Sequence, residues 1–204
     1  MRFVLGPIPP SETFDARALD WTPMISSNEL RWANVTSVVG LLLFLVAGCL
    51  CLQRAAFSPD VEPWLLVGAI VLTAVLIPLH EFFHCLGYLV PLHSRKLITG
   101  IWLARGIWYV VYDSPLPRGR VLLMLAAPFL FLSCLPCLAF PFLSGSRSWL
   151  LGYVVLMHVA LCVGDAITFF RIGVTIPKGA LIQNCGWKTY WSPLPIQSSG
   201  SPQS

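Results

Sequence analysis

Charged side chains are scarce in this sequence, and their scarcity excludes most soluble folds. Only 11% of the 204 residues are charged, while 56% are hydrophobic. A typical soluble domain carries about 25% charged residues. The chain also lacks any Lys- or Arg-rich run that would predict nucleic-acid binding. We therefore expect a protein that lies largely within a lipid bilayer.

Cysteines in polar loops are also missing, which excludes a secreted disulfide framework. The chain has seven cysteines, and only Cys185 lies outside an apolar run. We interpret the others as small apolar fillers of helices. A cleavable signal peptide is not expected either, because the proline-rich stretch 6–10 interrupts any apolar core near the N-terminus.

Long apolar runs are abundant. A membrane-spanning helix needs about 20 mostly apolar residues. Four segments meet that requirement, at residues 33–53, 63–90, 121–143 and 148–170. They predict an all-α membrane bundle, a four-span domain over residues 33–171. An N-terminal segment, 1–32, and a tail, 172–204, flank this domain.

The basic residues predict the orientation of these spans. Eleven of the 13 Lys and Arg residues lie in the N-terminal segment, in the loop between the second and third spans, or after the fourth span. Cytoplasmic loops carry such an excess of positive charge. We therefore expect both termini and the central loop, 91–120, on the cytoplasmic side.

The central loop contains two runs rich in β-branched and aromatic residues, 97–103 and 107–112. Ala104, Arg105 and Gly106 separate them and suit a turn, so a small β-hairpin is predicted. Another strand-like run follows at 179–191. The Ser-, Pro- and Gln-rich residues at the end of the tail predict disorder.

Only two acidic residues, Glu81 and Asp165, fall inside the four predicted spans. Ionisable groups in lipid cost a few kcal/mol each and usually mark function. Glu81 belongs to the sequence His80-Glu-Phe-Phe-His84, the H-E-x-x-H pattern. On a helix, residues four apart share one face, so both imidazoles can bind one Zn²⁺ ion while Glu81 serves as the general base.

Asp165 is the candidate for the third ligand of the metal. A catalytic zinc site normally has three protein ligands and one open position. His80 lies 16 residues after the outer end of its span and Asp165 lies 17 residues after the outer end of its own. At the helical rise these are depths of about 24 and 26 Å, so the two groups should meet at one level.

Structural interpretations of the same residues remain open. The His-Glu-His cluster could be a polar cluster bonded to neighbouring helices, and Asp165 could bond to a serine or a backbone group. His158 lies seven residues before Asp165, about 10 Å along a helix axis, which is too far for the two to share one zinc ion. We expect His158 to be a satisfied buried histidine or a group that supports a ligand.

The motif, the later Gly164-Asp165 pair and the four-span layout resemble the "putative zincin peptidase" family. Its members are small multi-pass proteins similar to the site-2 protease group of intramembrane metalloproteases. The resemblance covers roughly residues 63–191. It implies zinc on His80, His84 and Asp165, with Glu81 as the catalytic residue. The site-2 protease group has its acid in an Asp-Gly motif, whereas here Asp165 follows a glycine.

The function predicted from these observations is that of an intramembrane zinc metalloprotease. It would hydrolyse peptide bonds of membrane-associated polypeptides with a zinc-activated water. One alternative is a non-enzymatic membrane scaffold or chaperone with a structural metal site. A metal or proton transporter is a third, less favoured because the outer halves of the spans are nearly all apolar. The expected partners are the bilayer and a membrane-associated protein substrate.

Overall fold

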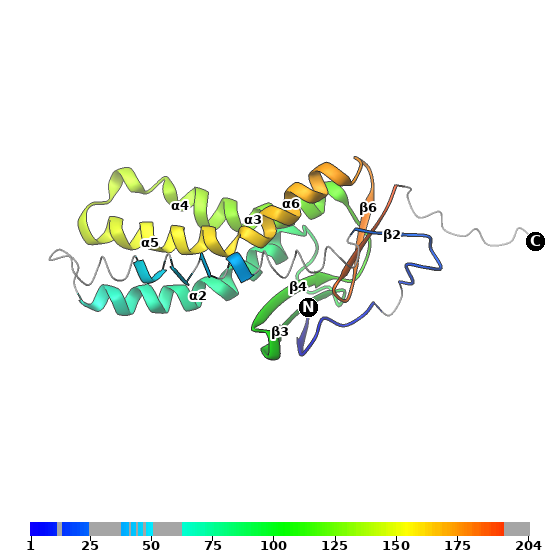
Figure 1. Cartoon of the computed structure of the whole chain (residues 1–204), viewed down its shortest axis with the longest axis horizontal. Coiled ribbons are helices and arrows are strands. Elements are labelled where there is room, and N and C mark those ends of the chain that lie inside the picture. Colours follow the sequence, from blue (N-terminus) through cyan, green and yellow to red (C-terminus); the bar gives the residue numbers. More distant parts are fainter. Residues whose placement is uncertain are drawn as a thin grey trace, which may run out of the picture.

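The helices gather at one end of the molecule and the strands at the other (Figure 1). In the computed structural model, the residues described are 1–11, 14–24, 38–40, 42–43, 45–46, 48–50 and 63–193. Most of the predicted first span, 33–53, lies outside the described residues, and so does the end of the tail for which disorder was predicted. Those described between 38 and 50 are helical.

Besides the helical residues between 38 and 50, three described stretches of chain form the helical end. The first is α2, and the second is α3 continued by three short segments. The third is a pair of helices, α5 and α6, that meet at Cys162. Their bounds are α2 Pro63–Gly87, α3 Arg118–Phe129, the π-helical segment η2 Leu130–Cys134, α4 Leu135–Cys137, η3 Phe140–Phe142, α5 Gly145–Leu161 and α6 Val163–Thr175.

Two helical stretches within the described residues are long and apolar enough to cross a membrane. They are Trp64–Gly87 and Arg118–Phe142. The α5–α6 pair passes the same test only as one broken span, because the two helices are bent by 49° at their junction. The second and third predicted spans thus correspond to apolar helices, and the fourth, 148–170, falls on the bent α5–α6 pair.

The prediction of an all-α bundle is wrong, because the described residues form a mixed α/β structure with two sheets. One sheet has the order β1-β3-β4 and the other has the order β2-β7-β6-β5. The strands are β1 Arg2–Leu5, β2 Thr22–Pro23, β3 Leu97–Trp102, β4 Ile107–Tyr112, β5 Leu116–Pro117, β6 Leu181–Cys185 and β7 Lys188–Ser192.

The predicted hairpin does form, as β3 and β4 joined by the short turn η1 (Leu103–Arg105) and Gly106. Sequence patterns missed its partner, since β1 adds to β3 in parallel from nearly 100 residues away. Gly100 permits this approach, because a Cβ there would clash with the carbonyl of Val4. The Tyr109 hydroxyl donates to the carbonyls of Gly6 and Pro7, and burial raises the pKa of this phenol.

The main hydrophobic core lies at the junction of helices and sheets. It joins the end of α2 to α3, α6 and the strands, and includes Tyr88, Leu97, Leu125, Ile172 and Ile182. Away from this junction, α2 exposes many apolar side chains, among them Val67 and Ile70 at 63% and 60%. Such a surface is far more apolar than water favours, and it suits a lipid environment.

Candidate metal centre

The H-E-x-x-H sequence lies on the last three turns of α2, beside the junction with the sheets. The helix continues through Pro78, so the two histidines remain one turn apart on one face. Both are buried, with 7% of His80 and 6% of His84 exposed. Their Nε2 atoms lie 3.0 Å apart. The helix therefore aims two imidazole nitrogens at one point.

Asp165 reaches the same point from the first turn of α6. Its Oδ2 atom lies 3.0 Å from Nε2 of His80 and 3.4 Å from Nε2 of His84. The bend after α5 starts a new helix there, so Asp165 lies at a helix N-terminus, where the partial positive charge favours a carboxylate. The structure thus brings together the three side chains that were predicted from the sequence to be ligands.

The three atoms form a triangle whose size suits a tetrahedral zinc ion. Its edges are 3.0, 3.0 and 3.4 Å. Bonds of about 2.0–2.1 Å at tetrahedral angles place ligand atoms about 3.3 Å apart. Oδ2 of Asp165 is buried and accepts no hydrogen bond, although both imidazoles are close. A buried carboxylate oxygen without a hydrogen bond is the kind of atom that a cation would satisfy.

The outer nitrogen of each histidine also has a partner. Nδ1 of His84 lies 2.9 Å from the backbone carbonyl of Met124 in α3. A carbonyl only accepts, so His84 carries its proton on Nδ1 and leaves the lone pair of Nε2 free for a metal. Nδ1 of His80 lies 3.2 Å from Nε2 of His158 in α5. Three separate helices therefore hold the two imidazoles.

Gly87 lets α3 come close enough to make the contact with His84. A Cβ at Gly87 would lie 2.6 Å from the Cα of Met124 and 3.0 Å from the Cβ of Ala127. Any larger side chain would push α3 away from the site. Gly164, which precedes Asp165, differs in this respect, because a Cβ placed there meets no atom within 4 Å.

Glu81 occupies the position expected of a group beside the metal. Its carboxylate oxygen and the ring nitrogens of His80 and His84 all lie within 4.8 Å of one another. The residue is partly buried, one position along the helix from the His80 face. It can therefore exchange a proton with a molecule bound next to the two imidazoles.

A second cluster of potential metal ligands lies behind His80. It consists of His80, His158 and Cys162, all buried, with their ligand atoms within 4.8 Å of one another. His158 was expected to be a satisfied buried histidine or to support a metal ligand. No role was predicted for Ser133, whose hydroxyl lies 2.7 Å from Nδ1 of His158. Ser133 is the only residue with a hydroxyl group in the apolar run 121–143, and this isolation could have singled it out in the sequence.

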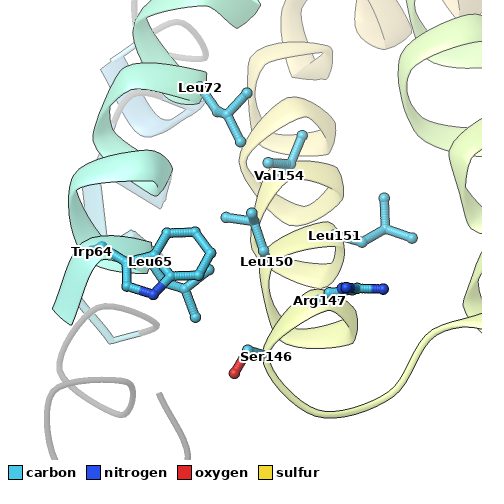
Figure 2. Close-up of a pocket in the computed structure, with 8 residues that line it drawn as sticks. All are labelled: Trp64, Leu65, Leu72, Ser146, Arg147, Leu150, Leu151 and Val154. Atoms are coloured by element: carbon cyan, nitrogen blue, oxygen red, sulfur yellow. The ribbon is translucent and has the colours of Figure 1, made fainter. Parts of the chain in front are cut away.

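A cavity lies elsewhere, between α2 and α5 (Figure 2). Its volume is about 470 Å³, and its lining is mostly apolar, with Arg147 and Ser146 at one end. The lining residues of α2 run from Trp64 to Leu72, which are 8 to 16 residues before His80. At 1.5 Å per residue they lie roughly 12–24 Å from the histidine along the helix. The cavity is therefore separate from the metal centre.

Two histidines a turn apart on a helix, a glutamate between them and an acidic side chain from another helix are the residue types that a zincin-type metal site combines. Residues 73–181, more than half of the chain, match the family described as "Putative zincin peptidase". The chain belongs to this family, whose description is that of a zinc metallopeptidase. No curated protein and no solved structure matches the chain.

Proposed function

We propose that the protein is an intramembrane zinc metallopeptidase that cleaves membrane-associated polypeptides. The observation that carries this proposal is the triangle of His80, His84 and Asp165, with edges of 3.0–3.4 Å, beside the carboxylate of Glu81. His80, Glu81 and His84 lie on a helix that is apolar and long enough to cross a bilayer. Asp165 lies on the bent α5–α6 pair, which passes the same test as one broken span. Membership of the zincin family supports the same reaction class.

Each residue has a distinct role in the proposed hydrolysis. His80, His84 and Asp165 would hold the ion and leave the fourth position of a tetrahedron for water or substrate. Zinc held there supplies a Lewis acid that polarises the substrate carbonyl and makes water acidic enough to react near neutral pH. Glu81 accepts a proton from the attacking water and delivers it to the amine nitrogen as the peptide bond breaks.

The sheet end offers a way to hold the substrate. A helical segment hides its peptide bonds, so the substrate must be extended where it is cut. Among the described residues that sheet has two edge strands, β1 and β4, and the edge strand that packs against α2 is β4. This strand lies beside the end of α2, where the Tyr88 hydroxyl donates to the carbonyl of Val110 at 3.4 Å. An extended segment could add to this edge through backbone hydrogen bonds.

We further propose that both termini and the sheets face the cytoplasm. Pairing of β1 with β3 and of β2 with β7 supports a single side for the N-terminal segment, the central loop and the tail. Those are the segments that hold most of the basic residues. The positive-inside rule assigns that side to the cytoplasm.

Glu81→Gln tests the catalytic proposal, because it keeps the shape of the side chain and removes its basicity. Cells producing equal amounts of wild type or Glu81→Gln would be compared by mass spectrometry for new peptide termini next to apolar segments. We expect such termini with the wild type and their loss in the variant. Zinc in the two purified proteins should remain near one ion per chain.

Two results would contradict the proposal. One is a purified wild type that binds no zinc under conditions where it stays folded. The other is the same set of peptide termini from both proteins, which would favour a scaffold with a structural metal. Loss of zinc together with loss of cleavage in Glu81→Gln would reject the assignment of Glu81 as a base that is not a ligand.

A further inference from the structure

His158 is the most deeply buried ionisable side chain near the metal centre, and the proposed hydrolysis assigns it no step. None of its surface is exposed. It lies on the last turn of α5, just before the bend at Cys162. Its Nε2 faces Nδ1 of His80 at 3.2 Å, on the opposite side of that imidazole from Asp165 and His84. It is thus placed to act on His80 rather than on a substrate.

The contacts of His158 link it to a third helical stretch. Its Nδ1 lies 2.7 Å from Oγ of Ser133. Ser133 is buried on the π-helical segment η2, between α3 and α4. Such single π-helical turns are rare and often occur at functional sites. The three side chains therefore form a continuous hydrogen-bonded row that runs from His80 through His158 to Ser133.

Only one set of proton positions in this row leaves His80 able to bind a metal. To offer the lone pair of Nε2, His80 must carry its proton on Nδ1 and donate it to His158. His158 must then accept at Nε2, carry its own proton on Nδ1 and donate that to Ser133. In the opposite arrangement both hydrogen bonds run the other way, from Ser133 to His158 and from His158 to His80. His80 then carries its proton on Nε2 and presents an N–H toward the place of the metal.

We propose that His158, held by Ser133, is a positioning residue that fixes the tautomer and the ring orientation of His80 for zinc binding. The inference rests on the proposed zinc site and adds the group that prepares one of its ligands. His84 has the backbone carbonyl of Met124 for this purpose, an acceptor that replacing the Met124 side chain would not delete. The acceptor for His80 belongs to a side chain. A substitution of His158 can therefore remove that acceptor without replacing a metal ligand.

The cluster of His80, His158 and Cys162 also raises the possibility of a second metal ion. The sulfur of Cys162 lies 3.6 and 3.8 Å from the two ring nitrogens of His158. An ion there would require Nδ1 of His80 to lose its proton while Nε2 binds the first ion. A hydrogen bond between Nδ1 of His80 and Nε2 of His158, 3.2 Å apart, instead satisfies both nitrogens without an ion. We therefore favour one ion and a hydrogen-bonded row.

The experiment compares two replacements of nearly equal shape. His158→Gln places an amide oxygen about where Nε2 lies and can accept the proton of His80, whereas His158→Met fills similar space without a strong acceptor. Zinc affinity of each purified full-length protein would be measured by competition with a chromophoric chelator. Loss of such a supporting group typically weakens metal binding 10–100-fold.

We expect wild type and His158→Gln to bind zinc with affinities within about fivefold, and His158→Met to bind it roughly 10–100-fold more weakly. Ser133→Ala should fall between them. Melting temperatures without zinc should agree between the Gln and Met variants, so that a difference in affinity reports the hydrogen bond. Visible spectra of the Co²⁺-loaded proteins should show the same order.

Three results would overturn the inference. Equal zinc affinity in the Gln and Met variants would show that the acceptor at residue 158 does not matter. Two zinc ions in the wild type, with one lost in His158→Met, would make His158 a ligand. A wild type without zinc would reject the proposed function as well, whereas the first two results leave that function intact.

Discussion

The two ends of helix α2 show how one sequence element serves both lipid and chemistry. Its first half exposes Val67, Ile70 and Val71, and lines an apolar cavity with Trp64 and Leu72. Its last turns carry the two buried histidines and pack tightly on α3 through Gly87. Apolar surface in lipid needs no specific partner, but a buried polar group does. Substitutions should therefore matter far more at the second end than at the first.

The largest effect is expected when a ligand is removed at the end of α2. His84→Ala should weaken zinc binding by more than about 100-fold, since even the loss of a supporting group costs 10–100-fold. The matched control is His93→Ala, because His93 is exposed in the loop after α2. Zinc content after dialysis would be measured for both proteins. Equal zinc in His84→Ala and His93→Ala would remove His84 from the site.

An intermediate effect is expected where α2 meets α3. Gly87→Ala places a Cβ 2.6 Å from the backbone of Met124, so α3 must move and the contact between His84 and the Met124 carbonyl must lengthen. Overpacking of this kind costs about 1–3 kcal/mol. Both the thermal unfolding midpoint in detergent and the zinc affinity should fall.

Gly68→Ala is the control within the same helix. A Cβ at Gly68 meets no atom within 4 Å. Alanine is also preferred to glycine in a helix by up to about 1 kcal/mol, so this variant should be neutral or slightly stabilised. A greater loss of stability in Gly68→Ala than in Gly87→Ala would invert the comparison between the two ends.

The smallest effect is expected at the cavity. Leu72 is 37% exposed and lines open space, so Leu72→Ala removes few contacts. Zinc affinity should equal that of the wild type, and the melting temperature should change by only a few degrees. A loss of zinc in Leu72→Ala would show that the two ends of α2 are coupled and would contradict this comparison.

Sequence patterns predicted the local features of this fold well. The apolar run 63–90 corresponds to a helix at Pro63–Gly87, and the β-branched runs of the central loop form a hairpin. What the patterns missed is non-local. Strand β2 has only two residues and pairs with β7 near the other end of the chain. No periodicity marks so short a strand, so an all-α bundle was predicted in its place.

The candidate site was predictable where it depends on spacing and burial cost. His80 and His84 followed from the four-residue interval, and Asp165 from its isolation in an apolar run. The depth argument for Asp165 assumed a straight helix, whereas the structure bends by 49° just before this residue. The role of the Met124 carbonyl could not be predicted from the sequence, because every residue has a carbonyl and only packing decides which one faces a histidine.

X-ray absorption at the zinc edge of the purified wild-type protein tests the central claim most directly. We expect one zinc ion per chain, with imidazole nitrogen and carboxylate oxygen neighbours at about 2.0–2.2 Å and no sulfur. A sulfur neighbour at about 2.3 Å would place the ion with Cys162 instead. Such a result, or the absence of zinc, would contradict a centre made by His80, His84 and Asp165.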